Sequence, residues 1–139
     1  MAIPFHEAQA IIEAAHEKAR SMGIRVTVAI VDEGGVLQAL GRMDGSFHLS
    51  SQIAEAKALG AALWHRDGAQ LASMKKDRPA FFEQVDRLVR LPLMPGLGSA
   101  VIRRQGEVQG GVGVSGAASE EDLECALAGL RAVGLEEKT

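Results

Sequence analysis

The fold is decided by residues 26–57, which read VTVAIVDEGGVLQALGRMDGSFHLSSQIAEAK. Two apolar runs, 26–31 and 36–40, flank the turn sequence DEGG at residues 32–35. Paired glycines reach the positive φ angles that tight turns require, so the two runs are predicted to form an antiparallel hairpin. A polar corner, RMDG at residues 42–45, then leads into a predicted helix. Such a corner between a strand and a helix N-terminus commonly holds a ligand's charged group.

Length and composition predict one globular domain, residues 1–139, with enough apolar residues (47%) to bury a core. The net charge of −3 and the scarcity of aromatic residues, with no Tyr, argue against nucleic acid as a partner. The single cysteine, Cys125, excludes an internal disulfide and fits a reducing compartment. No secretory signal or membrane-spanning segment is visible. We therefore expect a soluble cytoplasmic protein that does not bind a membrane.

The rest of the chain alternates helical and strand patterns. An apolar face with helical spacing covers residues 5–22 and ends at Gly23, and Ser119 begins the last helix with an acidic first turn. Further elements are predicted in the order helix 48–65, helix 68–74, helix 79–89, strand 89–93, strand 99–103 and strand 107–115. This order indicates an α+β fold with one antiparallel sheet and helices packed against it.

One strand pattern and one helix pattern predict how the helices pack on the sheet. Residues 108–116 alternate valine with glycine, and consecutive strand glycines suggest that something approaches the backbone closely. For helix 48–65, a spacing of about 100° per residue predicts a core stripe of five residues: Leu49, Ile53, Ala56, Gly60 and Leu63.

These motifs, taken in order, resemble the GlcG/HbpS-like family, which includes the C-terminal domain of PduO-type proteins. The resemblance covers nearly the whole chain. It rests on VDEGG at 31–35, RMDG at 42–45, the serine-to-lysine helix at 50–58, Pro95-Gly96, and the glycine-rich strand 110–116 followed by Glu121-Asp122. It implies a profilin-like α+β sandwich with a five-stranded antiparallel sheet, assembled into a homo-oligomer. We expect no adenosyltransferase chemistry, because the 139 residues resemble only the C-terminal domain of PduO-type proteins, and Leu97 stands where the family usually has a second glycine.

The resemblance also implies haem as a cofactor, because some members of the family bind it. We expect haem or another small carboxylate ligand to lie between the polar corner and the glycine-rich last strand. The candidate ligand-binding residues come from the shared motifs: Asp32, Arg42, Met43, Asp44, Ser50, Lys57, Pro95, Gly96, Gly113 and Ser115.

Each of the main candidates has a structural interpretation as well. Arg42 with Asp44 could clamp a carboxylate, since a guanidinium offers paired donors, or could form an ion pair that fixes the corner. Lys57 could bind a propionate or extend to solvent. Ser115 could donate a hydrogen bond to a ligand or be an ordinary turn residue.

Histidines are the natural candidates for the iron of a haem. His48 is the metal candidate, because it lies beside the polar corner at a helix start. His16 flanks the apolar stripe of the first helix, where a half-buried, hydrogen-bonded histidine is the commoner outcome. His6 and His65 lie at helix ends and are expected to be exposed.

Three functions remain open at this point. The first is a haem-binding or small-ligand-binding protein that performs no reaction. The second is an enzyme for a small organic acid or carbonyl compound, with Arg42 as the anchor and Asp44 or His48 as the acid-base group. The third is a structural or accessory subunit.

Overall fold

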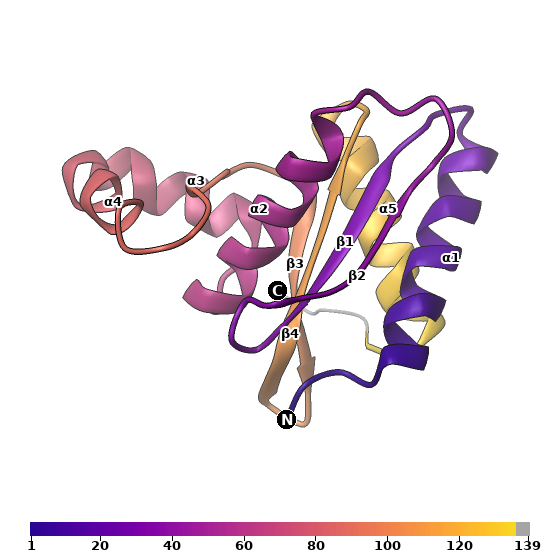
Figure 1. Ribbon diagram of the computed structural model, residues 1–139, viewed down its shortest axis with the longest axis horizontal. Helices are drawn as coiled ribbons and strands as arrows, with labels where there is room; N and C mark the ends of the chain where they lie inside the picture. Colours follow the sequence, from indigo (N-terminus) through magenta and orange to yellow (C-terminus); the bar gives the residue numbers. More distant parts are fainter. Residues whose placement is uncertain (136–139) are drawn as a thin grey trace.

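In a computed structural model, residues 1–135 form a four-stranded antiparallel sheet with helices on both faces (Figure 1). The predicted domain, 1–139, extends four residues beyond this described part. The elements in chain order are α1 (Phe5–Ser21), β1 (Thr27–Asp32), β2 (Leu37–Arg42), α2 (Ser50–Trp64), α3 (Gly68–Asp77), α4 (Pro79–Val85), β3 (Ser99–Arg104), β4 (Glu107–Ser115) and α5 (Ser119–Ala132). The predicted α+β class is confirmed.

The sheet consists of two hairpins joined through their inner strands. The strand order is β2-β1-β4-β3, so β1 and β4 form the centre while β2 and β3 are the edges. Thr27 of β1 lies opposite both Arg42 of β2 and Ser115 of β4. One end of the sheet therefore collects the polar corner, the end of the glycine-rich strand and the loop that follows α1.

Alternation along β1 divides the core into two layers. Val28 and Ile30 face the larger core, which α1 and α5 cover, while Ala29 and Val31 pack against α2 on the opposite face. The α2 layer is thin because its contacts are alanines and glycines. Helices α3 and α4 project from the body beside α2 and enclose a small cluster around Phe82.

A fifth strand was expected at residues 89–93, and this prediction is wrong: the described residues form four strands. The segment instead folds back on the end of α4, where the backbone N–H of Leu93 donates to the Asp86 carboxylate at 2.9 Å. Pro92 has no N–H to donate, which further disfavours a place within a sheet.

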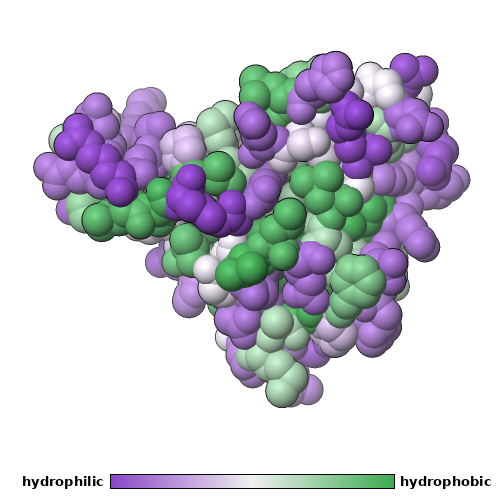
Figure 2. Space-filling model, viewed as in Figure 1, coloured by the Kyte–Doolittle hydropathy of each residue, from purple (hydrophilic) through white to green (hydrophobic). Residues whose placement is uncertain are grey.

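The core stripe predicted for α2 is wrong in part, because Ala56 and Gly60 are buried but the leucines at its two ends are not. The residues that pack on the sheet are Ala54, Ala58 and Ala62, whereas Leu49 and Leu63 are 54% and 40% exposed. Small side chains lie against the sheet because the glycines of β4 bring the helix backbone too close for leucine. The face that carries β2 and α2 consequently displays hydrophobic side chains in its middle, next to hydrophilic ones over α1 (Figure 2).

Candidate functional site

A groove between α1 and the edge strand β2 combines cationic, apolar and imidazole side chains. At one end, a cavity of about 330 Å³ is lined by six residues from α1, the following loop and the polar corner: His16, Arg20, Arg25, Arg42, Met43 and Asp44. Towards the other end, a cavity of about 280 Å³ is lined by Phe5, Gln9, Ile12, Glu13, Ala39 and Leu40. We call these two cavities together the α1–β2 groove.

The sequence builds one wall of the groove by helical spacing. Positions 5, 9, 12, 16 and 20 recur every three or four residues, so their side chains share one face of α1. The opposite wall is β2, which is an edge strand and leaves that side of the groove uncovered by a further strand. Gly41 lets the two walls approach: a Cβ there would lie 2.6 Å from Ile12 and 2.9 Å from the His16 ring.

His16 lies in the middle of the groove and is half-buried. Its Nε2 is 3.0 Å from the carbonyl oxygen of Gly41. Since a carbonyl can only accept, Nε2 carries the proton in the neutral ring and Nδ1 keeps a free lone pair. Burial lowers the pKa of His16, and the positive charge of Arg20 lowers it further, while the bond to Gly41 raises it. The neutral ring, the form that ligates metals, is therefore favoured.

The cationic end of the groove has an excess of positive charge. Arg20 pairs with Glu17 at 3.0 Å, Arg42 donates to the Ser46 carbonyl at 3.4 Å, and Arg25 makes no hydrogen bond or ion pair with another described residue. Asp44 is exposed and is the only carboxylate among the residues that line this cavity. An anionic group entering here would meet guanidinium groups suited to carboxylates.

Met43 of the polar corner contributes to the groove from its inner side. It is partly buried against the core under α1, and its sulfur accepts a 3.4 Å hydrogen bond from the backbone N–H of Val26. The predicted ion pair between Arg42 and Asp44 is not among the salt bridges of residues 1–135. The corner is held instead by backbone and Met43 contacts.

Both predicted serines lie on the α2 side of the sheet, and Ser115 belongs to the cross-strand row that contains Thr27 and Arg42. Ser50 begins α2, donates to the Phe47 carbonyl at 2.6 Å and shares a 2.7 Å hydroxyl contact with Thr27. Ser115 flanks Thr27 on the other side and is 4% exposed. Arg42 and Ser115 are thus on one face and two strands apart, about 10 Å at the usual strand spacing.

Helix α2 occupies the space over the glycine-rich strand. A Cβ on Gly113 would overlap the Ala54 carbonyl oxygen, and one on Gly111 would overlap that of Ala58. The close approach that the valine-glycine alternation predicts is therefore made by the chain's own helix. Gly113 faces α2, whose backbone fills the space beside it.

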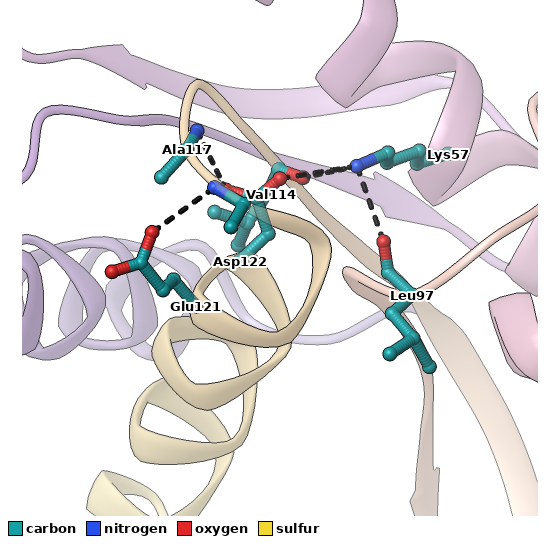
Figure 3. A network of polar contacts seen from close by, with 7 residues as sticks. Lys57, Leu97, Val114, Ala117, Glu121 and Asp122 are labelled. Carbon is teal, nitrogen blue, oxygen red and sulfur yellow. Dashed lines mark hydrogen bonds and ion pairs between the residues drawn. The ribbon is translucent and has the colours of Figure 1, made fainter.

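Lys57 forms a buried polar network rather than extending to solvent (Figure 3). Its ammonium group lies 2.9 Å from the Val114 carbonyl, 3.3 Å from that of Leu97 and 3.4 Å from the Asp122 carboxylate. Three acceptors match its three protons. Asp122 also accepts from the N–H of Ala117, and burial raises the pKa of Asp122 although Lys57 lowers it. The network joins α2, β4 and α5.

The remaining predicted residues lie away from the groove. Asp32 ends β1, whereas Arg42 lies opposite Thr27 at the start of that strand. The Asp32 carboxylate accepts hydrogen bonds from the N–H groups of Gly34 and Val36, which closes the hairpin turn. Gly96 bonds to Gly68 at the start of α3, with Pro95 beside it. His48 is exposed and lines none of the cavities described.

The sequence interpretation missed Arg20 and Arg25 and set His16 aside. The helical spacing that places Arg20 and His16 on the same face of α1 as Ile12 could have identified them, but that helix was interpreted as an ordinary amphipathic helix. No group of three or more His, Cys, Asp or Glu side chains suited to a metal ion occurs within residues 1–135. No helix in the same range is long and apolar enough to cross a bilayer.

These features define an α+β domain with an amphipathic groove beside one edge of its sheet. The chain belongs to the HbpS-like family, described as haem degrading protein HbpS-like, which matches residues 3–131. The predicted family resemblance is therefore confirmed.

Two relatives show the range of proteins that share this domain. GlcG of Escherichia coli K12 is 36% identical over 110 residues, which cover 78% of this chain and 77% of GlcG. The corrinoid adenosyltransferase PduO of Salmonella typhimurium is 28% identical over 135 residues, or 97% of this chain. The chain spans 40% of the length of PduO, so it matches only a part of that protein.

Solved structures match the whole fold. A complex of PduOC with haem has a TM-score of 0.87 and 25% sequence identity, covering 99% of this chain and 100% of that one. HbpS has a TM-score of 0.86 and 28% identity, covering 96% of this chain and 92% of that one.

Proposed function

We propose that this protein binds haem in the α1–β2 groove. The observation that carries the proposal is the distribution of side chains along the groove: apolar residues at one end, arginines at the other, and a half-buried imidazole between them. Haem has the same division, because its apolar macrocycle carries two propionates on one edge and a central iron. The haem complex of PduOC, similar over the whole chain, supports the same ligand.

The residues present fit the chemical groups of haem. Phe5, Ile12 and Ala39 would contact the macrocycle, while Arg25 and Arg42 would pair with the propionates. His16 would supply the axial ligand, since its Nε2–H to a backbone carbonyl is the usual arrangement that orients a metal-bound histidine. Iron chemistry itself would come from the haem, and the chain's part would be to hold and orient it.

Among the predicted ligand residues, the proposal keeps Arg42, Met43 and Asp44 as groove residues. Lys57, Asp122 and Ser50 would position the elements around the sheet end, and Asp32 would fix the hairpin. Homo-oligomer formation and a cytoplasmic location stay predictions. A small carboxylate on Arg42 remains the second candidate ligand, because the cationic end could hold one without the macrocycle.

Substitution of His16 separates this assignment from the His48 prediction. We expect His16→Ala to weaken haem binding roughly tenfold or more, since even residues that only orient metal ligands typically contribute 10–100-fold. The exposed His48 should be replaceable by alanine with less than a twofold change. The measurement is titration of each variant with haemin, followed by the Soret band.

Circular dichroism of both variants controls for folding. Loss of the Soret change in His48→Ala with binding intact in His16→Ala would return the axial role to His48. Unchanged spectra in the unmodified protein with excess haemin would reject haem as the ligand.

The lowered pKa of His16 gives haem binding a defined pH dependence. The ordinary pKa of histidine is 6.5. Because burial makes the charged ring unfavourable, His16 should stay neutral below that value, and haem affinity should hold to a lower pH than a free imidazole would allow. NMR titration of the ring in the haem-free protein measures the midpoint. A midpoint at or above 6.5 would contradict the burial seen here.

A further inference from the structure

A hydrophobic surface beside α2 stays uncovered in the described chain. Leu37 lies opposite Val31 and Leu40 opposite Ala29 across the β1–β2 pair, so both leucines are on the α2 face of the sheet. Helix α2 packs mainly over the central strands, and the two leucines of the edge strand are therefore 42% and 36% exposed. Figure 2 shows hydrophobic side chains gathered over these two elements.

The first hairpin turn and the end of α2 continue this surface. Val36, next to Leu37, is 62% exposed, and Leu63 in the last turn of α2 is also exposed. Leu63 lies against the turn, because a Cβ on Gly35 would be 3.3 Å from its Cδ2 atom. We call the surface formed by Val36, Leu37, Leu40 and Leu63 the α2–β2 face.

Both elements of the α2–β2 face have the properties of buried elements. One side of α2 packs its alanines on the sheet, and the other side carries a second apolar stripe that ends at Leu63. A helix that is apolar on both sides is usually covered on both. Strand β2 reads LQALGR and contains neither lysine nor proline, which commonly protect an exposed sheet edge. A contiguous exposed patch of this kind marks an interaction surface.

The charges of these elements indicate what covers the face. Helix α2 and strand β2 contain three charged residues, and each has a partner within the chain. Glu55 pairs with Arg90 at 2.5 Å, Lys57 belongs to the buried network with Asp122, and Arg42 donates to a backbone carbonyl. A partner recognised by its charge, such as an acidic peptide or an anionic membrane, would find no free charge on α2 or β2. An uncharged apolar surface is instead complementary to a copy of itself, as a two-fold interface requires.

We propose that two copies of this chain pack together through their α2–β2 faces across a two-fold axis. The leucines of one copy contact those of the other, and each copy covers the β2 edge of its partner. The proposal is independent of haem binding, because this face lies on the α2 side of β2 and the α1–β2 groove on the other. Leu40 also lines the groove, so it is left unchanged in the experiments.

Analytical ultracentrifugation of the haem-free full chain tests the proposal. At concentrations from about 1 to about 500 µM, we expect dimers of the 14.7 kDa chain or assemblies of such dimers. A protein that stays monomeric over this range would overturn the proposal, and the α2–β2 face would then be left for a different partner.

Two substitutions identify the surface involved. Leu37→Lys and Leu63→Lys should each raise the dissociation constant of the dimer at least tenfold, because the two-fold axis brings two new like charges into one apolar interface. Leu88→Lys is the matched control, since Leu88 is 83% exposed and follows α4, which projects away from the face. Circular dichroism of all three variants controls for folding. Unchanged association in Leu37→Lys and Leu63→Lys, or equal weakening in Leu88→Lys, would overturn the assignment.

A second measurement detects the contact without any substitution. In a mixture of isotope-labelled and unlabelled copies, filtered NMR experiments report only contacts between copies. We expect these contacts at the methyl groups of Leu37 and Leu63, and contacts confined to other surfaces would contradict the proposal. Haemin titration of Leu63→Lys should match that of the unmodified protein, so failure of the dimer and failure of haem binding are distinguishable.

Discussion

Replacing Lys57 with alanine is expected to lower the free energy of unfolding by about 3–5 kcal/mol, the usual effect of leaving one member of a buried ion pair alone. The Lys57 and Asp122 side chains are only 11% and 4% exposed. Without the ammonium group, Asp122 and two backbone carbonyls lose their shared partner inside the protein. Urea unfolding monitored by circular dichroism measures the loss.

The exposed pair Arg20–Glu17 provides the control, because its side chains are 60% and 77% exposed. Arg20→Ala should change the free energy of unfolding by less than about 0.5 kcal/mol. Replacing both Lys57 and Asp122 with apolar residues should recover part of the loss, since no buried charge then stays unpaired. A Lys57→Ala variant as stable as Arg20→Ala would show that the buried network contributes little.

Gly113→Ala is expected to destabilise the protein by about 3 kcal/mol or more, at or above the upper end of typical overpacking effects. The new methyl group would overlap the Ala54 carbonyl oxygen and lie 2.6 Å from the Ala58 backbone nitrogen. Because both atoms belong to the backbone of α2, the whole helix must shift from the sheet. Thermal unfolding should show a correspondingly large decrease in Tm.

Gly34→Ala is the matched control in the first hairpin. A Cβ at that position would lie 3.4 Å from the Asp32 carboxylate, an ordinary contact. We expect a change of less than about 1 kcal/mol. Similar destabilisation by the two substitutions would mean that α2 adjusts easily, and that the glycines of β4 are not required for its close packing.

Local patterns predicted most of the architecture. The DEGG turn and the alternation around it identified the first hairpin, and the valine-glycine strand correctly indicated a close backbone approach. The same glycines explain the failure on α2. Helical periodicity favoured the larger side chains as its core face, but the sheet has room there only for alanines, which is a property of the tertiary packing.

The site was predicted in part. The polar corner and the last strand do lie at one end of the sheet, as their positions in two hairpins suggested. The contact between His16 and Gly41 joins residues 25 positions apart across a helix and an edge strand. Local sequence patterns do not predict a contact between residues so far apart in the chain. The groove therefore could be identified only from the three-dimensional placement of α1 beside β2.

The most direct test of the central claim is a crystal structure of this protein with haem bound. We expect a haem lying between α1 and β2, with its propionates towards Arg42 and Arg25 and its iron on the side of His16. Haem bound on the outer face of α2, or beside β3 with the α1–β2 groove empty, would contradict it.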